Sequence, residues 1–280
     1  MQPLRDLEIG VVFWGGRDPA ETVREHKALG VRCGQLLVPG GMDAGPASQQ
    51  AWKRALEAEG FTVVTVFAAY DGEDYADIPA VQRTVGFIPR ETRAAREKRT
   101  YEVIDFGAAL GVKSFGCHIG YVPEDTCNSE YLAVRDMVRR VCDYAARHGQ
   151  TFALETGQEP APVLLRFFKD VGKPNLRINF DPANMILYGS GDPIDALTLL
   201  APHVESVHAK DGDWPPKGSP DALGVEKPLG QGSVGMERFV AKLKEVGFKA
   251  PLNIERETPD HAERLRDIKM GVGLLERLRG

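Results

Sequence analysis

Four residues in the second half of the chain are of the types that bind metal ions, and each follows a short apolar run. They are Glu155, Asp181, His208 and Glu255. Each lies at or near the carboxyl end of a run that predicts a β-strand. Three carboxylates and one imidazole form an oxygen-rich set, which suits Mn²⁺, Mg²⁺ or Co²⁺ better than a structural zinc ion. A divalent ion held in this way could stabilise negative charge that develops on a substrate oxygen.

The residues around each candidate ligand favour one shared site. Side chains alternate between the two faces of a strand, so the residue two positions earlier shares the ligand's face. These earlier residues are small or polar: Ala153, Asn179, Ser206 and Asn253. The intervening residues are large and apolar, as expected beneath helices: Leu154, Phe180, Val207 and Ile254. One acidic strand end alone would favour an unrelated polar residue, but the joint pattern favours a metal site.

The elements that would position these residues follow a repeating unit of amphipathic helix, glycine and apolar strand. Glycine suits the left-handed conformation that closes a helix. It stands at six such junctions: Gly30, Gly60, Gly111, Gly149, Gly172 and Gly247. Strands are expected at residues 8–13, 33–38, 62–68, 113–118, 151–155, 177–181, 204–209 and 251–255. Helices are expected near 19–29, 48–59, 92–110, 129–148, 161–171, 193–200, 235–246 and 260–278, the first with Asp18 as N-cap.

Eight strands alternating with eight helices predict an α/β fold, a single (β/α)8 TIM barrel over residues 1–280. A doubly wound open sheet is the alternative, but no strand is followed by a GxGxxG turn. Active sites of TIM barrels lie at the carboxyl ends of the strands, where the four candidate ligands would end neighbouring strands. The stretch 211–232, rich in glycine and proline, is expected to form an ordered, lid-like loop over the barrel mouth.

Composition excludes several classes of protein. The chain has 280 residues, 42% of them hydrophobic, with 40 acidic against 35 basic residues and a net charge of −5. This balance disfavours a nucleic-acid partner. No apolar stretch is long enough to cross a membrane, and the N-terminus lacks the features of a signal peptide. The four cysteines show no CxxC spacing, so we expect reduced thiols in a cytoplasmic protein.

Several motifs resemble the xylose isomerase-like TIM-barrel superfamily, in its sugar phosphate isomerase/epimerase branch. They are "FALETG", "NFDPANM", "VHAKD" and "LNIERE" around the four candidate ligands, and "GCHIGYVP" around His118. The resemblance covers essentially the whole chain and is strongest from residue 112 onward. That branch contains ketose 3-epimerases, hydroxypyruvate isomerases and inosose dehydratases. The resemblance implies one divalent metal bound by the four ligands, with Mn²⁺ expected first and Mg²⁺ or Co²⁺ as alternatives. Dimers and tetramers are common in the family, so a homo-oligomer is open.

An isomerase or epimerase of this kind acts on a small sugar or keto-polyol. It removes a proton next to a carbonyl and returns it, while a cation stabilises the developing negative charge. Two carboxylates on opposite faces of the substrate could remove the proton on one side and return it on the other. In the 3-epimerases that the chain resembles, the matching residues are Glu155 and Glu255, which we therefore expect to be catalytic as well as metal-binding.

Six further residues are candidates for substrate binding: His118, Asn184, Lys210, Trp14, Arg256 and Trp214. Small neighbours leave room for a ligand beside His118. Lys210 shares the face of His208 if the strand continues, although a rim lysine paired with Asp211 is an alternative. Trp14 could stack on a sugar face or pack internally, and Trp214 lies in the expected lid. Arg256 has the opposite parity to Glu255, so a structural ion pair is its alternative role.

One departure and three rival functions remain. Many superfamily members carry histidine three residues after the metal aspartate, where this chain has Asn184, so a specific ketose 3-epimerase activity does not carry over directly. DNA repair enzymes of the endonuclease IV type need extra histidines that this chain lacks. A lyase acting on an inosose or 3-keto-glycoside would share the first chemical step, with His118 as the acid. A non-enzymatic binding module would keep the ligands for stability alone.

The sequence shows no clear phosphate-binding signature. The segment "GQGSVG" at 230–235 precedes a helix and could supply backbone N–H donors, or form a plain glycine-rich turn. An unphosphorylated substrate is therefore favoured. The residues do not choose between isomerisation and elimination, and they fix neither the substrate nor the stereocentre.

Overall fold

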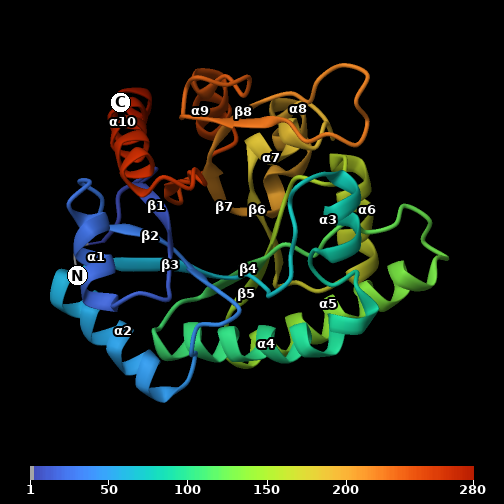
Figure 1. Ribbon diagram of the computed structural model, residues 1–280, viewed down its shortest axis with the longest axis horizontal. Coiled ribbons are helices and arrows are strands. Elements are labelled where there is room, and N and C mark those ends of the chain that lie inside the picture. The colour runs from blue at the N-terminus through green and yellow to red at the C-terminus, as the bar shows by residue number, and fades with distance from the viewer. Residues whose placement is uncertain (1–2) are drawn as a thin grey trace.

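The computed structural model describes residues 3–280, and its centre is a closed barrel of eight parallel strands (Figure 1). The strands run in the order β1-β10-β7-β6-β5-β4-β3-β2 around the barrel. Their bounds are β1 Ile9–Trp14, β2 Cys33–Val38, β3 Thr62–Ala68, β4 Ser114–Cys117, β5 Thr151–Glu155, β6 Leu176–Phe180, β7 Val204–Ala209 and β10 Leu252–Ile254. The predicted (β/α)8 TIM barrel is confirmed, and every predicted strand is present within two residues at each end.

Ten α-helices occur within residues 3–280. They are α1 Pro19–Lys27, α2 Pro46–Glu59, α3 Ile78–Thr84, α4 Arg90–Ala109, α5 Ser129–Arg147, α6 Ala161–Val171, α7 Pro182–Leu187, α8 Pro193–Leu200, α9 Met236–Glu245 and α10 His261–Arg279, with a 3₁₀ turn η1 at Ala201–His203. All eight predicted helices are present. The sequence reading missed α3 and α7, which are too short to show a helical period. It also missed an antiparallel ribbon inside the expected lid, formed by β8 Asp211–Asp213 and β9 Val225–Lys227.

Local signals explain where the helices begin and end. Asp18 accepts a hydrogen bond from the backbone N–H of Glu21, and Pro19 begins α1, as predicted. The glycines predicted to close helices all have positive φ: Gly30, Gly60, Gly111, Gly149, Gly172 and Gly247. A side chain at these positions would be strained, which fixes each helix end and thereby the start of the strand that follows.

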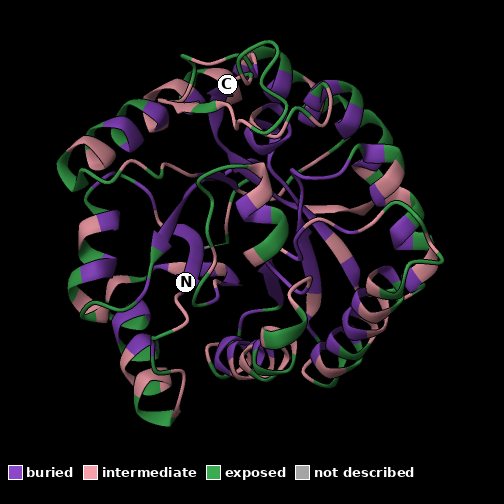
Figure 2. Ribbon diagram, turned by 45° about the vertical axis from the view of Figure 1, so that its right-hand side comes forward, coloured by how far each residue is buried: buried purple, intermediate pink, exposed green. Residues whose placement is uncertain are grey.

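The barrel has a large outer core and a small inner one. Leu154, Phe180, Val207 and Ile254 point outward into the main core between strands and helices, as the alternation predicted. Inside the barrel, Val12, Leu37 and Phe67 form a separate apolar cluster on β1, β2 and β3. The facing strands instead place buried polar residues inside: Asn179, Ser206, Asn253. Figure 2 shows buried residues along the strands and exposed residues on the outer faces of the helices. The apolar cluster therefore lies on one side of the barrel interior, and the strands facing it carry buried polar residues.

A buried carboxylate at the amino-terminal end of the barrel contacts three arginines. Glu8 is 4% exposed, accepts hydrogen bonds from Arg5 and Arg32, and lies 3.7 Å from the guanidinium of Arg279. Burial alone would raise the pKa of Glu8, but the hydrogen bonds from Arg5 and Arg32 outweigh it and hold the pKa at about 2. The ionised form is therefore the form that the folded state prefers.

We expect Glu8→Gln to lower the free energy of unfolding at pH 7 by about 2 kcal/mol. Because the folded pKa lies below the usual 4.5, this contribution is complete above that value and is lost as the pH falls toward 2. Urea unfolding of both proteins at pH 7 and near pH 3 measures the difference. A gap between wild type and variant that is equally large at both pH values would contradict this assignment.

Two findings bear on the compositional predictions. Within residues 3–280 no helix is both long and apolar enough to span a membrane. The cysteines are unpaired, with Cys33, Cys117 and Cys142 buried and Cys127 exposed.

Candidate metal centre and active-site cavity

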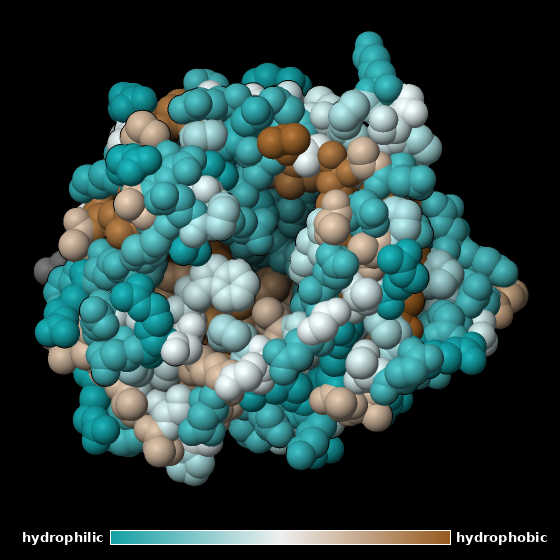
Figure 3. All heavy atoms as spheres, in the orientation of Figure 1, coloured by the Kyte–Doolittle hydropathy of each residue, from teal (hydrophilic) through white to brown (hydrophobic). Residues whose placement is uncertain are grey.

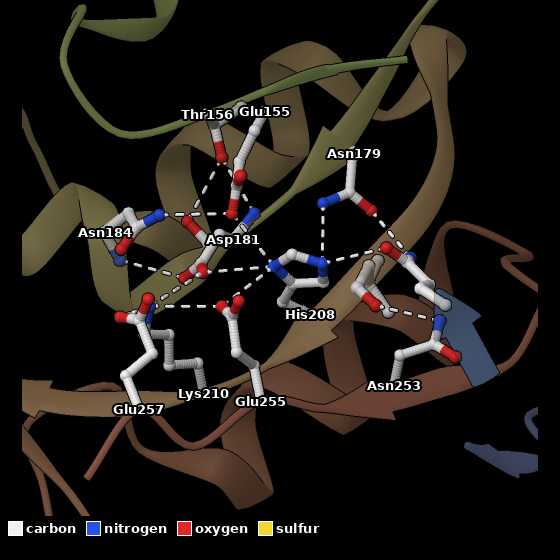
Figure 4. Close-up of polar contacts among 12 residues, drawn as sticks. Glu155, Thr156, Asn179, Asp181, Asn184, His208, Lys210, Asn253, Glu255 and Glu257 are labelled. Atoms are coloured by element: carbon white, nitrogen blue, oxygen red, sulfur yellow. Dashed lines mark hydrogen bonds and ion pairs between the residues drawn. The ribbon is translucent and has the colours of Figure 1, made fainter. Parts of the chain in front are cut away.

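The four candidate ligands meet at the carboxyl ends of adjacent strands (Figure 4). Glu155 ends β5, Asp181 follows β6, His208 lies next to the end of β7, and Glu255 follows β10. All four are buried, and one ligand atom from each lies within 4.8 Å of those of the others. They form a group that could hold a metal ion.

The donor atoms of this cluster converge on one point and fit a divalent cation. His208 Nδ1 lies 2.9 Å from Glu155 Oε1, 3.1 Å from Glu255 Oε2 and 3.4 Å from Asp181 Oδ2. His208 Nδ1, Glu255 Oε2 and Asp181 Oδ2 are buried without a hydrogen bond of acceptable geometry. Polar atoms left in this state are costly unless they bind something. Three carboxylate oxygens and one imidazole nitrogen are ligands that Mn²⁺ or Mg²⁺ accepts.

The charges in the cluster keep two of its carboxylates ionised. Burial alone would raise the pKa of Glu155, but the charges of His118 and His208 outweigh it and hold the pKa at about 2. Burial acts in the same direction on Glu255, and there His208 and Lys210 hold the pKa well below its usual range. For Asp181, burial prevails and raises the pKa to about 6. A bound cation would favour the ionised form of Asp181 as well.

Asp181 is held in place by the turn that follows β6. Its Oδ1 accepts from the backbone N–H of Asn184 at 2.9 Å, so this oxygen caps α7. Its own backbone N–H donates to Thr156 Oγ1 at 2.8 Å. These contacts fix the backbone and one oxygen, and they leave Oδ2 directed into the cluster (Figure 4).

A cavity of about 380 Å³ opens above the cluster. Six residues predicted for the site line it: Glu155, Glu255, His118, Asn184, Lys210 and Trp14. Asp181 and His208 are not among the lining residues, so within the cluster the two glutamates are the members that face the cavity. Figure 3 shows a hollow near the middle of one face of the molecule, bordered by both hydrophilic and hydrophobic residues.

His118 and Asn184 both contact Glu155. His118 Nε2 lies 2.8 Å from Glu155 Oε2, and Asn184 Nδ2 donates to Glu155 Oε1 at 3.2 Å. Burial alone would lower the pKa of His118, but the neighbouring carboxylate of Glu155 outweighs it and raises the pKa to about 9. On its other side, His118 Nδ1 lies 3.3 Å from the side-chain amide nitrogen of Gln158.

Lys210 is 3% exposed, and its ammonium group is held by two glutamates of the cavity wall. Nζ lies 2.6 Å from Glu257 Oε2 and 3.1 Å from Glu255 Oε2. The alternative of a rim lysine paired with Asp211 is therefore wrong.

The carboxylate of Asp211 instead organises the loop over the barrel mouth. It accepts hydrogen bonds from the backbone N–H groups of Gly212, Gly230, Gly232 and Val234. Three of these donors belong to the glycine-rich segment that could have bound a phosphate. The anion that this segment binds is thus a carboxylate of the chain itself.

Two predicted substrate-binding residues do not line the cavity. Trp214 is 44% exposed and lies outside the lining. Arg256 pairs with Asp267 at 2.8 Å and with Glu226 at 3.2 Å. These contacts match the structural ion pair considered as its alternative role.

The cavity also has walls that the sequence reading did not assign. Tyr75, Glu226 and Glu257 line it, together with Phe67 and Tyr188. Glu257 carried a signal, because it follows Glu255 by two residues and so shares its face. Tyr75 lies in the loop after β3, and Glu226 lies in the ribbon. In such irregular segments the sequence has no hydrophobic period that would predict which side chains face the cavity.

The chain matches a family model described as "Xylose isomerase-like TIM barrel" over residues 23–278. A crystal structure of a xylose isomerase domain protein from Planctomyces limnophilus is 40% identical, with a TM-score of 0.94 and 98% of each chain covered. The Escherichia coli protein YihM is 28% identical over 152 residues, which are 53% of this chain and 42% of that protein. The chain thus matches about two fifths of the length of this curated relative.

More distant solved structures share the fold. The 3-keto-D-glucoside 4-epimerase YcjR from Escherichia coli is 16% identical, with a TM-score of 0.69 and coverage of 97% of this chain and 99% of that one. A xylose isomerase-like TIM-barrel protein from Mycobacterium smegmatis, in complex with magnesium, is 14% identical, with a TM-score of 0.69 and coverage of 97% and 96%. At these identities the likeness concerns the fold alone.

Proposed function

Because the chain belongs to the xylose isomerase-like TIM-barrel family, we propose that it is a divalent-metal-dependent sugar isomerase or epimerase. The reaction would begin with removal of a proton next to the carbonyl of a ketose or keto-polyol. The observation that carries this proposal is the placement of Glu155 and Glu255, which belong to the metal-type cluster and also line the cavity.

The positions of the two glutamates suit acid–base chemistry on both faces of a substrate. They stand at the ends of β5 and β10, and β6 and β7 lie between these strands in the barrel. A carbon atom bound between them could lose a proton to one carboxylate and receive one from the other. Asp181 and His208 do not line the cavity, so we assign to them metal binding without proton transfer.

Glu155, Asp181, His208 and Glu255 would hold the metal, with Mn²⁺ as the expected ion and Mg²⁺ or Co²⁺ as alternatives. When bound, the ion would supply Lewis-acid stabilisation of negative charge on the substrate oxygen. The ammonium of Lys210 and the amide of Asn184, which both line the cavity, would orient substrate hydroxyls. Trp14 and Tyr75 supply aromatic faces against which the apolar face of a sugar ring can stack.

The charge of the cavity favours a neutral substrate. Five carboxylates line it: Glu73, Glu155, Glu226, Glu255 and Glu257. Lys210 is the one lysine or arginine among the lining residues that the structure describes. With a divalent cation bound and His118 protonated, five carboxylates face four positive charges, so a phosphate or carboxylate group on the substrate would gain no net attraction from the cavity wall.

A lyase is the second candidate, and the position of His118 favours it. This imidazole lies on the cavity wall, 2.8 Å from Glu155. After Glu155 has removed a proton, His118 could protonate a leaving group on the neighbouring carbon. An inosose or a 3-keto-glycoside would provide such a leaving group.

Deuterium exchange tests both candidates at once. The protein would be loaded with Mn²⁺ or Mg²⁺ in D₂O and offered ketoses, inososes, 3-keto-glucosides and hydroxypyruvate, with phosphate esters of the ketoses as charged counterparts. We expect deuterium at a carbon next to the carbonyl of a neutral substrate, with no loss of mass elsewhere. Release of water or of an aglycone would make the enzyme a lyase. Preference for the phosphate esters would overturn the neutral-substrate assignment, and exchange that is unchanged without metal would overturn the metal-dependent mechanism.

A further inference from the structure

A buried amide lies beside the apolar cluster of the barrel interior, on the side opposite the candidate metal ligands. Gln35 lies on β2, one strand away from Val12 and Phe67, and it is fully buried. Burying an amide in such surroundings is costly unless its hydrogen bonds are satisfied. Gln35 satisfies them across the barrel, on β6 and β7, which are far from β2 in the chain.

The contacts of Gln35 end at the candidate metal ligand His208. Gln35 Nε2 donates to Asn179 Oδ1 at 3.0 Å, and Gln35 Oε1 lies 3.0 Å from His208 Nε2. Asn179 Oδ1 also accepts from Ser206 Oγ at 2.5 Å. The Asn179 oxygen is thus engaged away from the imidazole, and its NH₂ group faces Nε2 at 3.0 Å (Figure 4). Gln35 Oε1 can accept a hydrogen bond from Nε2, whereas the NH₂ group of Asn179 could hydrogen-bond Nε2 only in the other tautomer.

The other ring nitrogen of His208, Nδ1, is the one that could bind the metal. His208 Nδ1 faces the carboxylate oxygens of Glu155, Glu255 and Asp181. An imidazole nitrogen can bind a metal only through its lone pair, so the ring proton must then lie on the other nitrogen. Partners that hold that proton fix the ring orientation and strengthen the ligand.

We infer that Gln35 is a positioning residue, whose side-chain carbonyl holds the proton of His208 on Nε2 and directs the Nδ1 lone pair at the metal. This inference rests on the proposed metal centre. It explains why an amide stands among apolar residues on the far side of the barrel. It also assigns a role to Asn179 and Ser206. Asn179 accepts hydrogen bonds from Ser206 and from Gln35, and so helps to orient the Gln35 amide that contacts His208.

Two substitutions at Gln35 separate the effect of its hydrogen-bond acceptor from the effect of its side-chain volume. Gln35→Met keeps a similar length and removes the acceptor, whereas Gln35→Glu keeps an acceptor for the Nε2 proton. We expect Gln35→Met to weaken Mn²⁺ binding about 10- to 100-fold in titration calorimetry. Gln35→Glu loses the donor to Asn179 Oδ1 but keeps the acceptor for Nε2, so we expect it to weaken binding less than Gln35→Met. Gln150→Met is the matched control, because Gln150 is also a buried glutamine but bonds the backbone carbonyl of Val112, away from the cluster.

Nitrogen NMR of the histidine rings gives a readout that does not depend on activity or on a variant that folds. In the wild-type protein with Mg²⁺, we expect His208 to carry its proton on Nε2. A proton on Nδ1 instead, or unchanged Mn²⁺ affinity in folded Gln35→Met, would overturn the role of Gln35 while leaving the metal centre intact. If Mn²⁺ affinity were the same in wild type and in His208→Ala, the proposed metal centre itself would fail, and this inference with it.

Discussion

Glu155→Gln is expected to reduce deuterium exchange into the substrate by at least about 10²- to 10⁴-fold, because the amide cannot accept a proton from carbon. The amide oxygen can still face a cation, so metal affinity should fall much less than turnover. Exchange measured by mass spectrometry, beside Mn²⁺ titration of the same sample, separates the two effects. This separation is the signature of a residue that both binds metal and moves a proton.

Glu257→Gln is the matched control for this experiment. Glu257 lines the same cavity and contacts Lys210, but it lies outside the metal-type cluster. We expect Glu257→Gln to change the apparent substrate affinity more than the rate of deuterium exchange. Exchange at the wild-type rate in Glu155→Gln would remove Glu155 from the proposed acid–base pair. Equal losses in turnover and metal affinity would reduce its role to that of a ligand.

Asp211→Ala is expected to have the largest effect on stability, about 2–4 kcal/mol in the free energy of unfolding. The substitution removes the acceptor of four backbone N–H groups, two of which belong to Gly230 and Gly232. These donors would remain in a partly closed environment without a partner. Asp211→Asn should also destabilise the protein, because one end of the amide would place donors against donors.

Asp213→Ala provides the comparison for this second prediction. Asp213 lies two residues away on the same ribbon strand, but its side chain is about half exposed and forms one hydrogen bond with Ser233 and one ion pair with Lys227. We expect this substitution to cost less than about 1 kcal/mol. Hydrogen exchange of the amides in residues 230–234 should become faster in Asp211→Ala alone. Similar stabilities for the two variants would show that Asp211 does not hold the loop together.

The sequence predicted the barrel well because its signals are local. Glycine after an amphipathic stretch favours the left-handed conformation that ends a helix, and an apolar run of five or six residues predicts a strand. The strict alternation of side chains along a strand also placed Leu154 and Phe180 outside and Glu155 inside. Parallel strands closed into a barrel gather their carboxyl ends at one mouth, so the meeting of Glu155, Asp181, His208 and Glu255 followed from their positions at strand ends.

The short helices and the ribbon were not predicted from the sequence, because their stability comes from tertiary contacts. Helix α7 has six residues and begins at the cap provided by Asp181, a residue with a second task in the cluster. The ribbon of β8 and β9 depends on the loop that is held by Asp211, whose carboxylate accepts hydrogen bonds from backbone N–H groups 19 to 23 residues further along the chain. Neither feature has a period long enough to be detected in one sequence.

The sequence by itself thus determined the barrel, the ligand types and the end of the barrel at which they meet, because each depends on spacing along one strand. Only the tertiary structure decided which cluster members face the cavity, how Lys210 is paired and where Arg256 and Trp214 lie. It also decided that Gln35 on β2 reaches His208 on β7, 173 residues further along the chain. Such contacts depend on the closure of the barrel, which brings opposite strands together with no local signal in either.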